Sequence, residues 1–234
     1  MSWFDRFRSL EARRRRALAK AAPGSPLEAF LSAPQVDPNT PLEQAPIVSL
    51  DLETTGLDPR KDEIVSIGLV EMQHQAIHLG TAWHQLVRLD KDLPQQSVVI
   101  HNITDDQLLA GRPIEELLPE LLQRLRGKVM LAHYKAVELN FISAACEKLY
   151  GAPFVMPIID TLELGLRVFE LQNHTIHANN LRLFNLRPRY NLPQYRAHNA
   201  LTDALATAEL LLAISGDIAP RGNAPLKDFL SRRP

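Results

Sequence analysis

The 234 residues suffice for one sizeable core, and their composition, 45% hydrophobic and 23% charged with a net charge of −1, is that of a soluble globular protein. No apolar run approaches the ~18 residues of a membrane span, which excludes a transmembrane segment, and the charged start gives no sign of an export signal. The single cysteine, Cys146, excludes an intramolecular disulfide and suits a reducing compartment, so we expect a cytoplasmic protein.

Residues 1–46 differ in composition from the rest of the chain. Apolar residues at helical spacing predict a short helix near the start, and a cationic run gives residues 1–20 a net charge of +5, against −6 for the remainder. The stretch that follows is rich in proline and small polar residues, which indicates a linker or a loosely packed arm. The basic arm could contact nucleic acid, an acidic protein partner or an anionic membrane surface, although a solvated charged helix is the simplest interpretation.

The compact domain is expected to span residues 47–215, followed by a short C-terminal tail at 216–234. We predict its strands from three signals: alternation of apolar and polar residues, a high content of β-branched residues, and short apolar runs. These strands lie at 47–53, 63–72, 81–89, 128–133 and 156–160. Leucine spacing and glycine stops predict its helices, which we place at 104–111, 114–127, 136–151, 161–171 and 200–214. Strands that alternate with helices after an initial meander predict an α/β fold with three layers and a mixed central sheet.

Two carboxylates, Asp51 and Glu53, interrupt the apolar run of the first predicted strand in the stretch SLDLETTGL. Side chains two residues apart on a strand point to the same face, so these carboxylates project together and repel each other. A cation must compensate, and the nearest basic residues, Arg60 and Lys61, lie beyond a turn. A hard divalent cation is the other solution, because Mg²⁺ and Mn²⁺ prefer carboxylate oxygens. An exposed strand end without a metal is the competing interpretation.

Three further residues complete a candidate cluster. Glu138 falls in the first turn of a predicted helix, where the helix dipole favours an anion, and Asp203 falls early in the last helix. His198 precedes Asp203 by five residues, which on a continuous helix corresponds to about 140°. The two can therefore share a site only if His198 lies on the irregular segment before that helix, where it is free to act as a base. Ordinary helix-terminal acids and a surface histidine are the competing interpretations.

Three stretches, DLETTGL, LAHYKAVELNFI and HNALTDALATAEL, resemble the motifs of the DEDDh (DnaQ-like) 3′–5′ exonucleases, the group that includes the proofreading epsilon subunit of bacterial replicative DNA polymerase. The resemblance covers residues 47–214 and leaves the first 46 residues unexplained. It implies an RNase H-like fold, in which helices flank a mixed sheet. It also implies hydrolysis of phosphodiester bonds at the 3′ ends of single-stranded nucleic acid, with release of nucleoside monophosphates.

The resemblance implies a role for each residue of the cluster. Two Mg²⁺ or Mn²⁺ ions would be held by four acids, with Asp51 bridging both ions, Glu53 and Asp203 completing the first, and Glu138 supporting the second. Such a pair stabilises the attacking and leaving oxygens of an in-line phosphoryl displacement. His198 would take the proton from the attacking water, a role that suits a side chain which ordinarily titrates near neutral pH.

The resemblance also implies a substrate-binding group in the turn after the second carboxylate and at the end of the strand at 128–133: Thr54, Thr55, Gly56, Leu57 and His133. Of these, Leu57 is expected to pack on a base. The sequence departs from the family pattern at two positions of the second motif, because Glu138 stands where the family usually has aspartate and Tyr134 where it has asparagine. The extra methylene of the glutamate changes the preferred geometry of that ligand.

Residues 171–202 contain four arginines and three aromatic residues without an intervening acid: Arg182, Arg187, Arg189 and Arg196, with Phe184, Tyr190 and Tyr195. This pattern would suit a track for a single-stranded backbone near the site. A solvated surface with the tyrosines packed inward is the alternative.

These features together predict a metal-dependent 3′–5′ exonuclease that acts on single-stranded nucleic acid, with DNA the expected substrate. Two alternatives remain open: a nuclease-fold adaptor or binding module with weakened catalysis, and an exoribonuclease directed at RNA. We expect a free-standing nuclease rather than a polymerase-bound one. The reason is that the epsilon subunit makes its polymerase contact through a long C-terminal extension, and here only about twenty residues follow the last helix.

Overall fold

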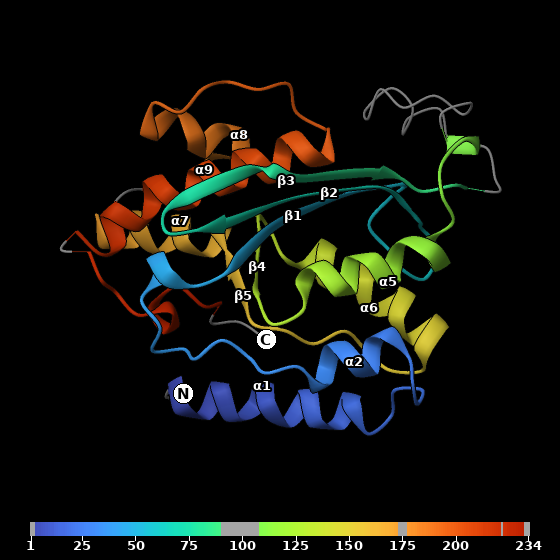
Figure 1. Cartoon of the computed structure of the whole chain (residues 1–234). Helices are drawn as coiled ribbons and strands as arrows, with labels where there is room; N and C mark the ends of the chain where they lie inside the picture. Colours follow the sequence, from blue (N-terminus) through green and yellow to red (C-terminus); the bar gives the residue numbers. More distant parts are fainter. Residues whose placement is uncertain (1–2, 90–107, 173–176, 221, 232–234) are drawn as a thin grey trace.

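The structure, a computed structural model, describes residues 3–89, 108–172, 177–220 and 222–231, and shows a central sheet with helices on both faces (Figure 1). Its strands, in chain order, are β1 (Ile47–Thr54), β2 (Ile64–Gln73), β3 (Ala76–Leu86), β4 (Val129–Ala132) and β5 (Ile158–Asp160). The order across the sheet is β3-β2-β1-β4-β5; β2 is antiparallel to β1 and β3, whereas β4 is parallel to β1 and β5. The predicted α/β fold with a mixed sheet is confirmed.

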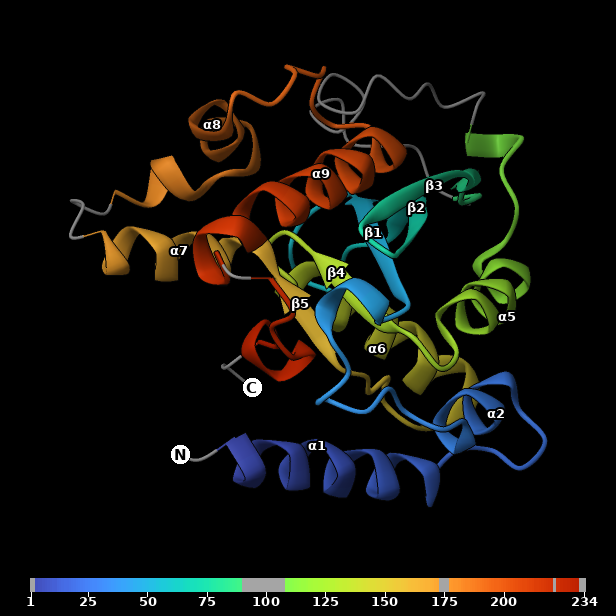
Figure 2. The ribbon, with the colours of Figure 1, turned by 60° about the vertical axis from the view of Figure 1, so that its left-hand side comes forward.

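Helices form a layer on each face of this sheet (Figure 2). The α-helices are α1 (Trp3–Leu18), α2 (Pro26–Ser32), α5 (Ile114–Leu125), α6 (Ala136–Tyr150), α7 (Thr161–Leu171), α8 (Leu183–Leu186) and α9 (Ala200–Ile218). Short 3₁₀ turns occur at η1 (Leu42–Gln44), η2 (Ala178–Leu181), η3 (Arg187–Tyr190) and η4 (Leu226–Asp228). One layer contains α5 and α6 with α1 and α2 beyond them, and the other contains α7, α8 and α9.

The central strand β1 divides its side chains between the two layers. Val48 and Leu50 belong to the core formed with α5 and α6, whereas Ile47 belongs to the core formed with α7 and α9. Because side chains alternate along a strand, Asp51 and Glu53 continue the row of Ile47 and project toward the α9 side. The strand therefore aims both carboxylates at the same helix.

The β2–β3 hairpin turns at His74 and Gln75, which both have positive φ angles, 53° and 57°. Two successive positive φ angles are a property of the type I′ turn, whose twist matches that of the strands it joins. As a result β3 starts at Ala76 rather than at residue 81. The predicted start was wrong because histidine and glutamine are not among the residues that usually mark this turn.

The N-terminal segment is more structured than its composition indicated. Residues 22–46 were expected to form a linker or a loosely packed arm, yet three side chains of α2 are buried in the core beside α5: Leu27, Phe30 and Leu31. Ser25 caps this helix by accepting a hydrogen bond from the Glu28 N–H at 3.2 Å. Pro26 occupies the first turn, where a missing N–H costs nothing.

The C-terminal residues also join the core. Helix α9 continues to Ile218, and Leu226 and Phe229 are buried against α7 and α9. Leu230 then forms an isolated bridge with Ile159 of β5. The segment that we expected to be a tail thus covers the end of the β4–β5 edge.

Of the helix predicted at 104–111, residues 104–107 lie outside the described residues, and the helical residues that follow are too few to test its length. Within the part of the chain that the structure describes, every helix is too short or too polar to span a membrane.

Candidate active site

The first carboxylates of the site come from the carboxyl end of β1. Glu53 is buried and Asp51 is half-buried, and both lie on the central strand between β2 and β4. Burial raises the pKa of Asp51 well above its usual range, and repulsion from Glu138, Asp203 and Glu53 raises it further. The carboxylates of three separate elements are therefore close enough for their charges to interact.

Helix α9 contributes Asp203 from its first turn, as predicted. Asn199 caps the helix by accepting a hydrogen bond from the Thr202 N–H at 3.0 Å. His198 lies immediately before this cap in the left-handed region, at φ 69°, and its backbone N–H donates to Asp203 Oδ2 at 3.1 Å. The prediction that His198 sits on an irregular segment before the helix is confirmed.

The side chains of Glu53, His198 and Asp203 meet at one point. Each offers one potential ligand atom, and these atoms lie within 4.8 Å of one another. Glu53 and Asp203 are buried, whereas His198 is exposed. The arrangement places two carboxylate oxygens and an imidazole nitrogen around a single position that opens to solvent on the histidine side.

A glycine allows α9 to approach the sheet closely enough to form this cluster. Gly68 on β2 is the partner of Asp51 in the β1–β2 register. A Cβ atom at Gly68 would lie 2.1 Å from the backbone nitrogen of Leu201 and 2.2 Å from the carbonyl carbon of Ala200. Ser49 fixes the same contact from β1, because its hydroxyl donates to the Ala204 carbonyl at 2.7 Å.

Glu138 approaches the cluster from the other layer, in the first turn of α6. Only 2% of its surface is exposed, and its Oε2 atom is buried without a hydrogen-bond partner among the described residues. Burial raises the pKa of Glu138 to about 8, and repulsion from Asp160 and Glu53 contributes to this rise. Backbone hydrogen bonds from Glu138 itself and from Leu52 act in the opposite direction. A buried carboxylate oxygen with no donor is a group that a cation would stabilise.

These observations fit a site for divalent cations. Oxygen ligands predominate, burial and then repulsion from nearby carboxylates raise the pKa values of Asp51 and Glu138, and one buried oxygen lacks a donor. Hard divalent cations prefer such carboxylate sets. The nearby cation Lys135 is already engaged, since its Nζ lies 2.7 Å from Glu163 Oε1.

The end of β1 and the β1–β2 loop carry four of the predicted substrate-binding residues. The Thr54 hydroxyl donates to the Gly56 carbonyl at 2.6 Å, and Thr55 Oγ1 accepts the Glu63 N–H at 3.0 Å. A side chain at Gly56 would collide with the carboxylate of Asp62. In contrast, Leu57 is 79% exposed. The loop thus stabilises itself through its polar residues and leaves Leu57 open to a ligand.

His133, the fifth predicted substrate-binding residue, has a partner inside the protein. Its Nδ1 lies 2.8 Å from Thr161 Oγ1, and its side chain is only partly exposed. Burial lowers its pKa to about 4, although a backbone hydrogen bond involving Leu181 acts in the opposite direction. The ring is therefore neutral at physiological pH.

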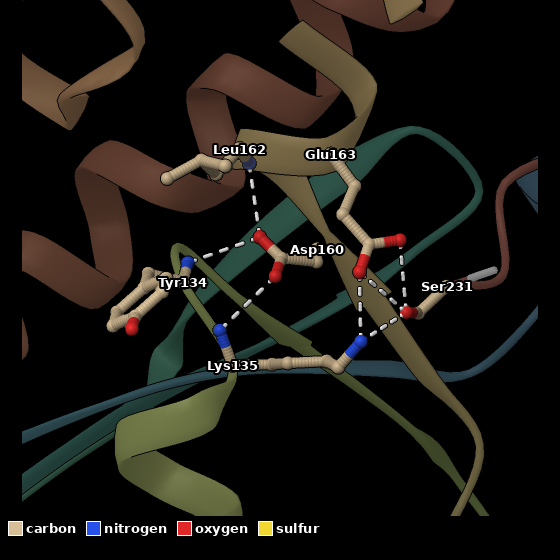
Figure 3. Close-up of polar contacts among 6 residues, drawn as sticks. All are labelled: Tyr134, Lys135, Asp160, Leu162, Glu163 and Ser231. Atoms are coloured by element: carbon tan, nitrogen blue, oxygen red, sulfur yellow. Dashed lines mark hydrogen bonds and ion pairs between the residues drawn. The ribbon is translucent and has the colours of Figure 1, made fainter. Parts of the chain in front are cut away.

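Asp160 has two roles, and the sequence indicates only the first, because an aspartate directly before a predicted helix is a typical N-cap. Asp160 does cap α7, since its Oδ1 accepts the Leu162 N–H at 3.0 Å. Its carboxylate also accepts the backbone N–H groups of Tyr134 at 3.0 Å and Lys135 at 3.1 Å, which join β4 to α6 (Figure 3). Nothing local in the sequence indicates this contact, because Asp160 is 26 residues from Tyr134.

His84 is another residue that the sequence reasoning did not single out. It lies on β3 opposite Gly68, so one row across the sheet contains Asp51, Gly68 and His84. Burial lowers the pKa of His84, and the charge of Glu53 partly opposes this shift. A histidine on an alternating strand is a weak signal, and only the register places it beside the cluster.

The arginine-rich segment 171–202 is partly buried rather than a continuous cationic track. Arg187 is fully buried, with its NH2 group 2.7 Å from Glu209 Oε2, and it lies over the Tyr195 ring. Tyr195 donates to the same carboxylate at 2.7 Å. Arg182 and Arg196 are exposed. Tyr195 is partly buried, as the alternative with inward-packed tyrosines expected, whereas the full burial of Arg187 fits neither interpretation. Both residues anchor the segment that leads to His198.

The protein has a mixed sheet with a carboxylate cluster at the end of its central strand. These features define its class as an RNase H-like nuclease fold. A family model described as "Exonuclease" (RNase_T) matches residues 48–211. The chain therefore belongs to this exonuclease family, and the predicted kinship with the DEDDh exonucleases is confirmed. DEDDh exonucleases use divalent metal ions, which agrees with the donor set described above.

Individual relatives support the same assignment. The chain is 34% identical over 170 residues to a DNA polymerase III PolC-type protein of Thermotoga petrophila, and 32% identical over 185 residues to a DNA polymerase III subunit epsilon-like protein of Rhodobacter capsulatus. These matches cover 73% and 78% of this chain, but only 12% and 25% of the relatives. The chain thus corresponds to one part of much longer proteins.

The fold also matches solved structures. The nuclease domain of 3′hExo, a DEDDh family member bound to rAMP, superposes with a TM-score of 0.65 at 17% sequence identity. The match covers 79% of this chain and 99% of that domain. At this level of identity the likeness establishes the fold.

Proposed function

We propose that the chain is a divalent-metal-dependent 3′–5′ exonuclease that acts on single-stranded 3′ ends and releases nucleoside monophosphates. The observation that carries this proposal is the meeting of Glu53, His198 and Asp203 within 4.8 Å, with Asp51 and Glu138 electrostatically coupled to the same cluster. Such a set combines oxygen ligands for hard cations with one group that can move a proton.

The residues divide into holders of cations and a proton acceptor. Asp51, Glu53 and Asp203 would hold one divalent ion, and Glu138 would support a second. When bound, the ions would stabilise the negative charge that develops on the phosphodiester oxygens during hydrolysis. A ring nitrogen of His198, exposed at the mouth of the cluster, would accept the proton of the attacking water.

The choice of a single-stranded 3′ end rests on what solved structures of similar fold bind and on the exposure of Leu57. One solved relative is Exonuclease I in complex with a dT13 oligonucleotide, and another is a 3′-exonuclease recognising a histone mRNA stem-loop. In this chain the exposed Leu57 lies on the loop that follows Glu53, where it can contact a base. DNA and RNA are therefore both to be tested, with DNA the proposed substrate.

The test uses two single-stranded oligonucleotides of identical sequence, one DNA and one RNA, each labelled at the 5′ end. With Mg²⁺ or Mn²⁺ the wild-type chain should shorten the labelled strand stepwise from its 3′ end, and chelation should stop the reaction. Asp51→Ala is the control, because it removes one of the carboxylates that would hold the cations. Equal cleavage by Asp51→Ala, or internal cleavage, contradicts the proposal. Tight binding without cleavage by the wild type favours a nuclease-fold binding module instead.

A further inference from the structure

The candidate site is flanked by exposed apolar side chains. Within the described part of the chain, five large hydrophobic residues are conspicuously exposed: Leu57, Leu79, Leu109, Tyr134 and Leu171. Leu57 follows the carboxylates of β1, and Tyr134, 54% exposed, precedes Glu138 by four residues. Exposing a large ring to water forgoes the stabilisation that its burial would give, so the placement of Tyr134 calls for a functional reason.

The register of the sheet places Tyr134 next to the cluster. In the parallel pairing of β1 with β4, Ser49 lies opposite Leu131. Strand β4 ends at Ala132, two residues before Tyr134, beside the strand that carries Asp51 and Glu53, and neighbouring strands are only ~4.8 Å apart. The loop also leads directly into α6, because the Val137 N–H donates to the Tyr134 carbonyl at 3.3 Å. Tyr134 therefore stands at the carboxyl ends of the central strands, where ligands of α/β sheets bind.

The backbone of Tyr134 is held in an unfavourable conformation. Its φ angle is 69°, in the left-handed region that bulky residues rarely adopt, and such strain persists only where surrounding contacts enforce it. Asp160 supplies those contacts by accepting the N–H groups of Tyr134 and Lys135 (Figure 3). The figure shows the Tyr134 ring pointing away from these contacts.

A second set of contacts fixes the next residue along the loop. The Lys135 side chain, which is nearly buried, forms an ion pair with Glu163 at 2.7 Å and a hydrogen bond with Ser231 (Figure 3). Ser231 in turn donates to the Glu163 carboxylate at 2.9 Å. The loop is thus attached to α7 and to the C-terminal segment, so the orientation of Tyr134 is set before any ligand arrives.

We infer that Tyr134 is a substrate-binding residue whose ring stacks on a nucleobase near the 3′ end. This inference rests on the proposed function and adds a specific contact to it. Aromatic stacking suits single-stranded nucleic acid because every base presents a π-face, and the contact is tolerant of sequence. Leu57 on the opposite loop and Tyr134 would contact the strand from two sides of the carboxylate cluster. A ring held rigidly in place binds a base without losing further conformational freedom.

The test measures the affinity for a single-stranded oligonucleotide in a chain that carries Asp51→Asn, which prevents cleavage. The fluorescent base 2-aminopurine is placed in turn at each of the last three positions at the 3′ end of the oligonucleotide. Tyr134→Asn removes the ring and also relieves the backbone, since asparagine tolerates positive φ. We expect Tyr134→Asn to weaken binding about 5- to 150-fold, the equivalent of ~1–3 kcal/mol for one stacked base, with an unchanged or higher melting temperature. Tyr134→Phe should bind as the wild type does and quench 2-aminopurine at one position.

The controls separate this inference from the proposed function. Leu79→Ala removes another exposed apolar side chain, on β3, and should leave affinity unchanged. An abasic site at the quenched position should weaken binding by the chain carrying Tyr134, yet have no further effect on Tyr134→Asn. If the wild type degrades the oligonucleotide but Tyr134→Asn binds equally well, the stacking inference is overturned and the exonuclease proposal stands. If the wild type neither binds nor degrades it, both are overturned.

Discussion

His198 links the polypeptide backbone to the chemistry of the cluster. Its N–H holds Asp203 Oδ2, while its ring nitrogen lies near the oxygens of Glu53 and Asp203. The left-handed conformation at φ 69° makes both contacts possible, because it turns the chain sharply just before the Asn199 cap. A histidine at this position can serve either as a proton acceptor or as an additional ligand, and the two roles have different consequences.

We predict that His198→Ala lowers the rate of 3′ hydrolysis by ~10²–10⁴-fold, the usual contribution of a positioned general base. Metal affinity should survive, because the carboxylates remain. Single-turnover rates and calorimetric titration with Mn²⁺ measure the two quantities separately. His198→Asn is the matched variant, since asparagine tolerates the positive φ angle and keeps the loop in place.

The control for this pair is His177→Ala, which removes an exposed histidine outside the cluster and should leave the rate unchanged. A large loss of Mn²⁺ affinity in both His198→Ala and His198→Asn would mean that the imidazole is a ligand and not a base.

At the scale of elements, the site depends on how closely α9 approaches the sheet. The cluster forms because β1 and α9 bring Glu53 and Asp203 together, and Gly68 on β2 leaves the space for the first turn of α9. The atoms that a Cβ at Gly68 would meet belong to the backbone of Ala200 and Leu201, so no side-chain rotation can relieve the collision.

We predict that Gly68→Ala displaces the start of α9, lowers the free energy of unfolding by ~1–3 kcal/mol, and reduces hydrolysis more strongly than the stability loss explains. Urea denaturation and steady-state rates below the unfolding transition test this. Gly80→Ala on β3 is the matched control, because nothing lies within 4 Å of its prospective Cβ. Equal activity of Gly68→Ala and Gly80→Ala would show that the close approach does not position the site.

The same elements predict how stability depends on pH. The pKa of Glu138 rises to about 8 and that of Asp51 also rises on folding, because burial disfavours their charged forms and neighbouring carboxylates repel them. An acid with a raised folded pKa contributes stability that is lost as the pH rises through that value. His133 and His84 have lowered pKa values in the folded protein, so they reduce its stability as the pH falls. This effect is confined to pH values below about 6.5, the usual pKa of histidine. Among the described residues, Glu138 and Asp51 therefore set the trend above pH 6.5.

We therefore predict that the melting temperature of the metal-free protein falls between pH 6.5 and 8. Glu138→Gln, which keeps the shape and removes the charge, should flatten this slope. Mg²⁺ or Mn²⁺ should raise the melting temperature more at pH 8 than at pH 6.5, because ligands bind metal in their deprotonated forms. Scanning calorimetry over this range gives both slopes; a metal-free melting temperature that is constant, or equally sloped in Glu138→Gln, contradicts the interpretation.

At the scale of the whole molecule, local patterns predicted most of the elements but not their contacts. Strand β1, helix α7 and the start of α9 follow from alternation, helical spacing and caps, and these local signals led to Asp51, Glu53 and Asp203. The β2–β3 turn was missed because its residues are unusual for positive φ angles. The double role of Asp160 was missed because it depends on strand pairing between segments far apart in the chain.

The N-terminal segment shows the same limit of local reasoning. Its proline content indicated a linker, but the sequence GSPLE also contains a helix start, with Ser25 as cap and Pro26 in the first turn. Arg14 of α1 then attaches to this helix by donating to the carbonyls of Phe30, Leu31 and Ala33 at 2.6–2.9 Å. One arginine of the cationic run is therefore committed to folding.

Phe30 provides the sharpest test of whether residues 1–46 belong to the folded unit. Its ring is 2% exposed and stacks on Phe154 with the ring centroids 5.1 Å apart. We predict that Phe30→Ala lowers the free energy of unfolding by ~3–5 kcal/mol, a fall in melting temperature of ~6–20 °C for a chain of this length. Leu171→Ala, at an exposed position on α7, is the control and should have little effect. If Phe30→Ala has the same melting temperature as the wild type, the segment is a dispensable arm, and a chain starting at residue 47 should fold equally well. If it melts lower, because the cavity left beside Phe154 cannot refill, that shorter chain should lose stability too.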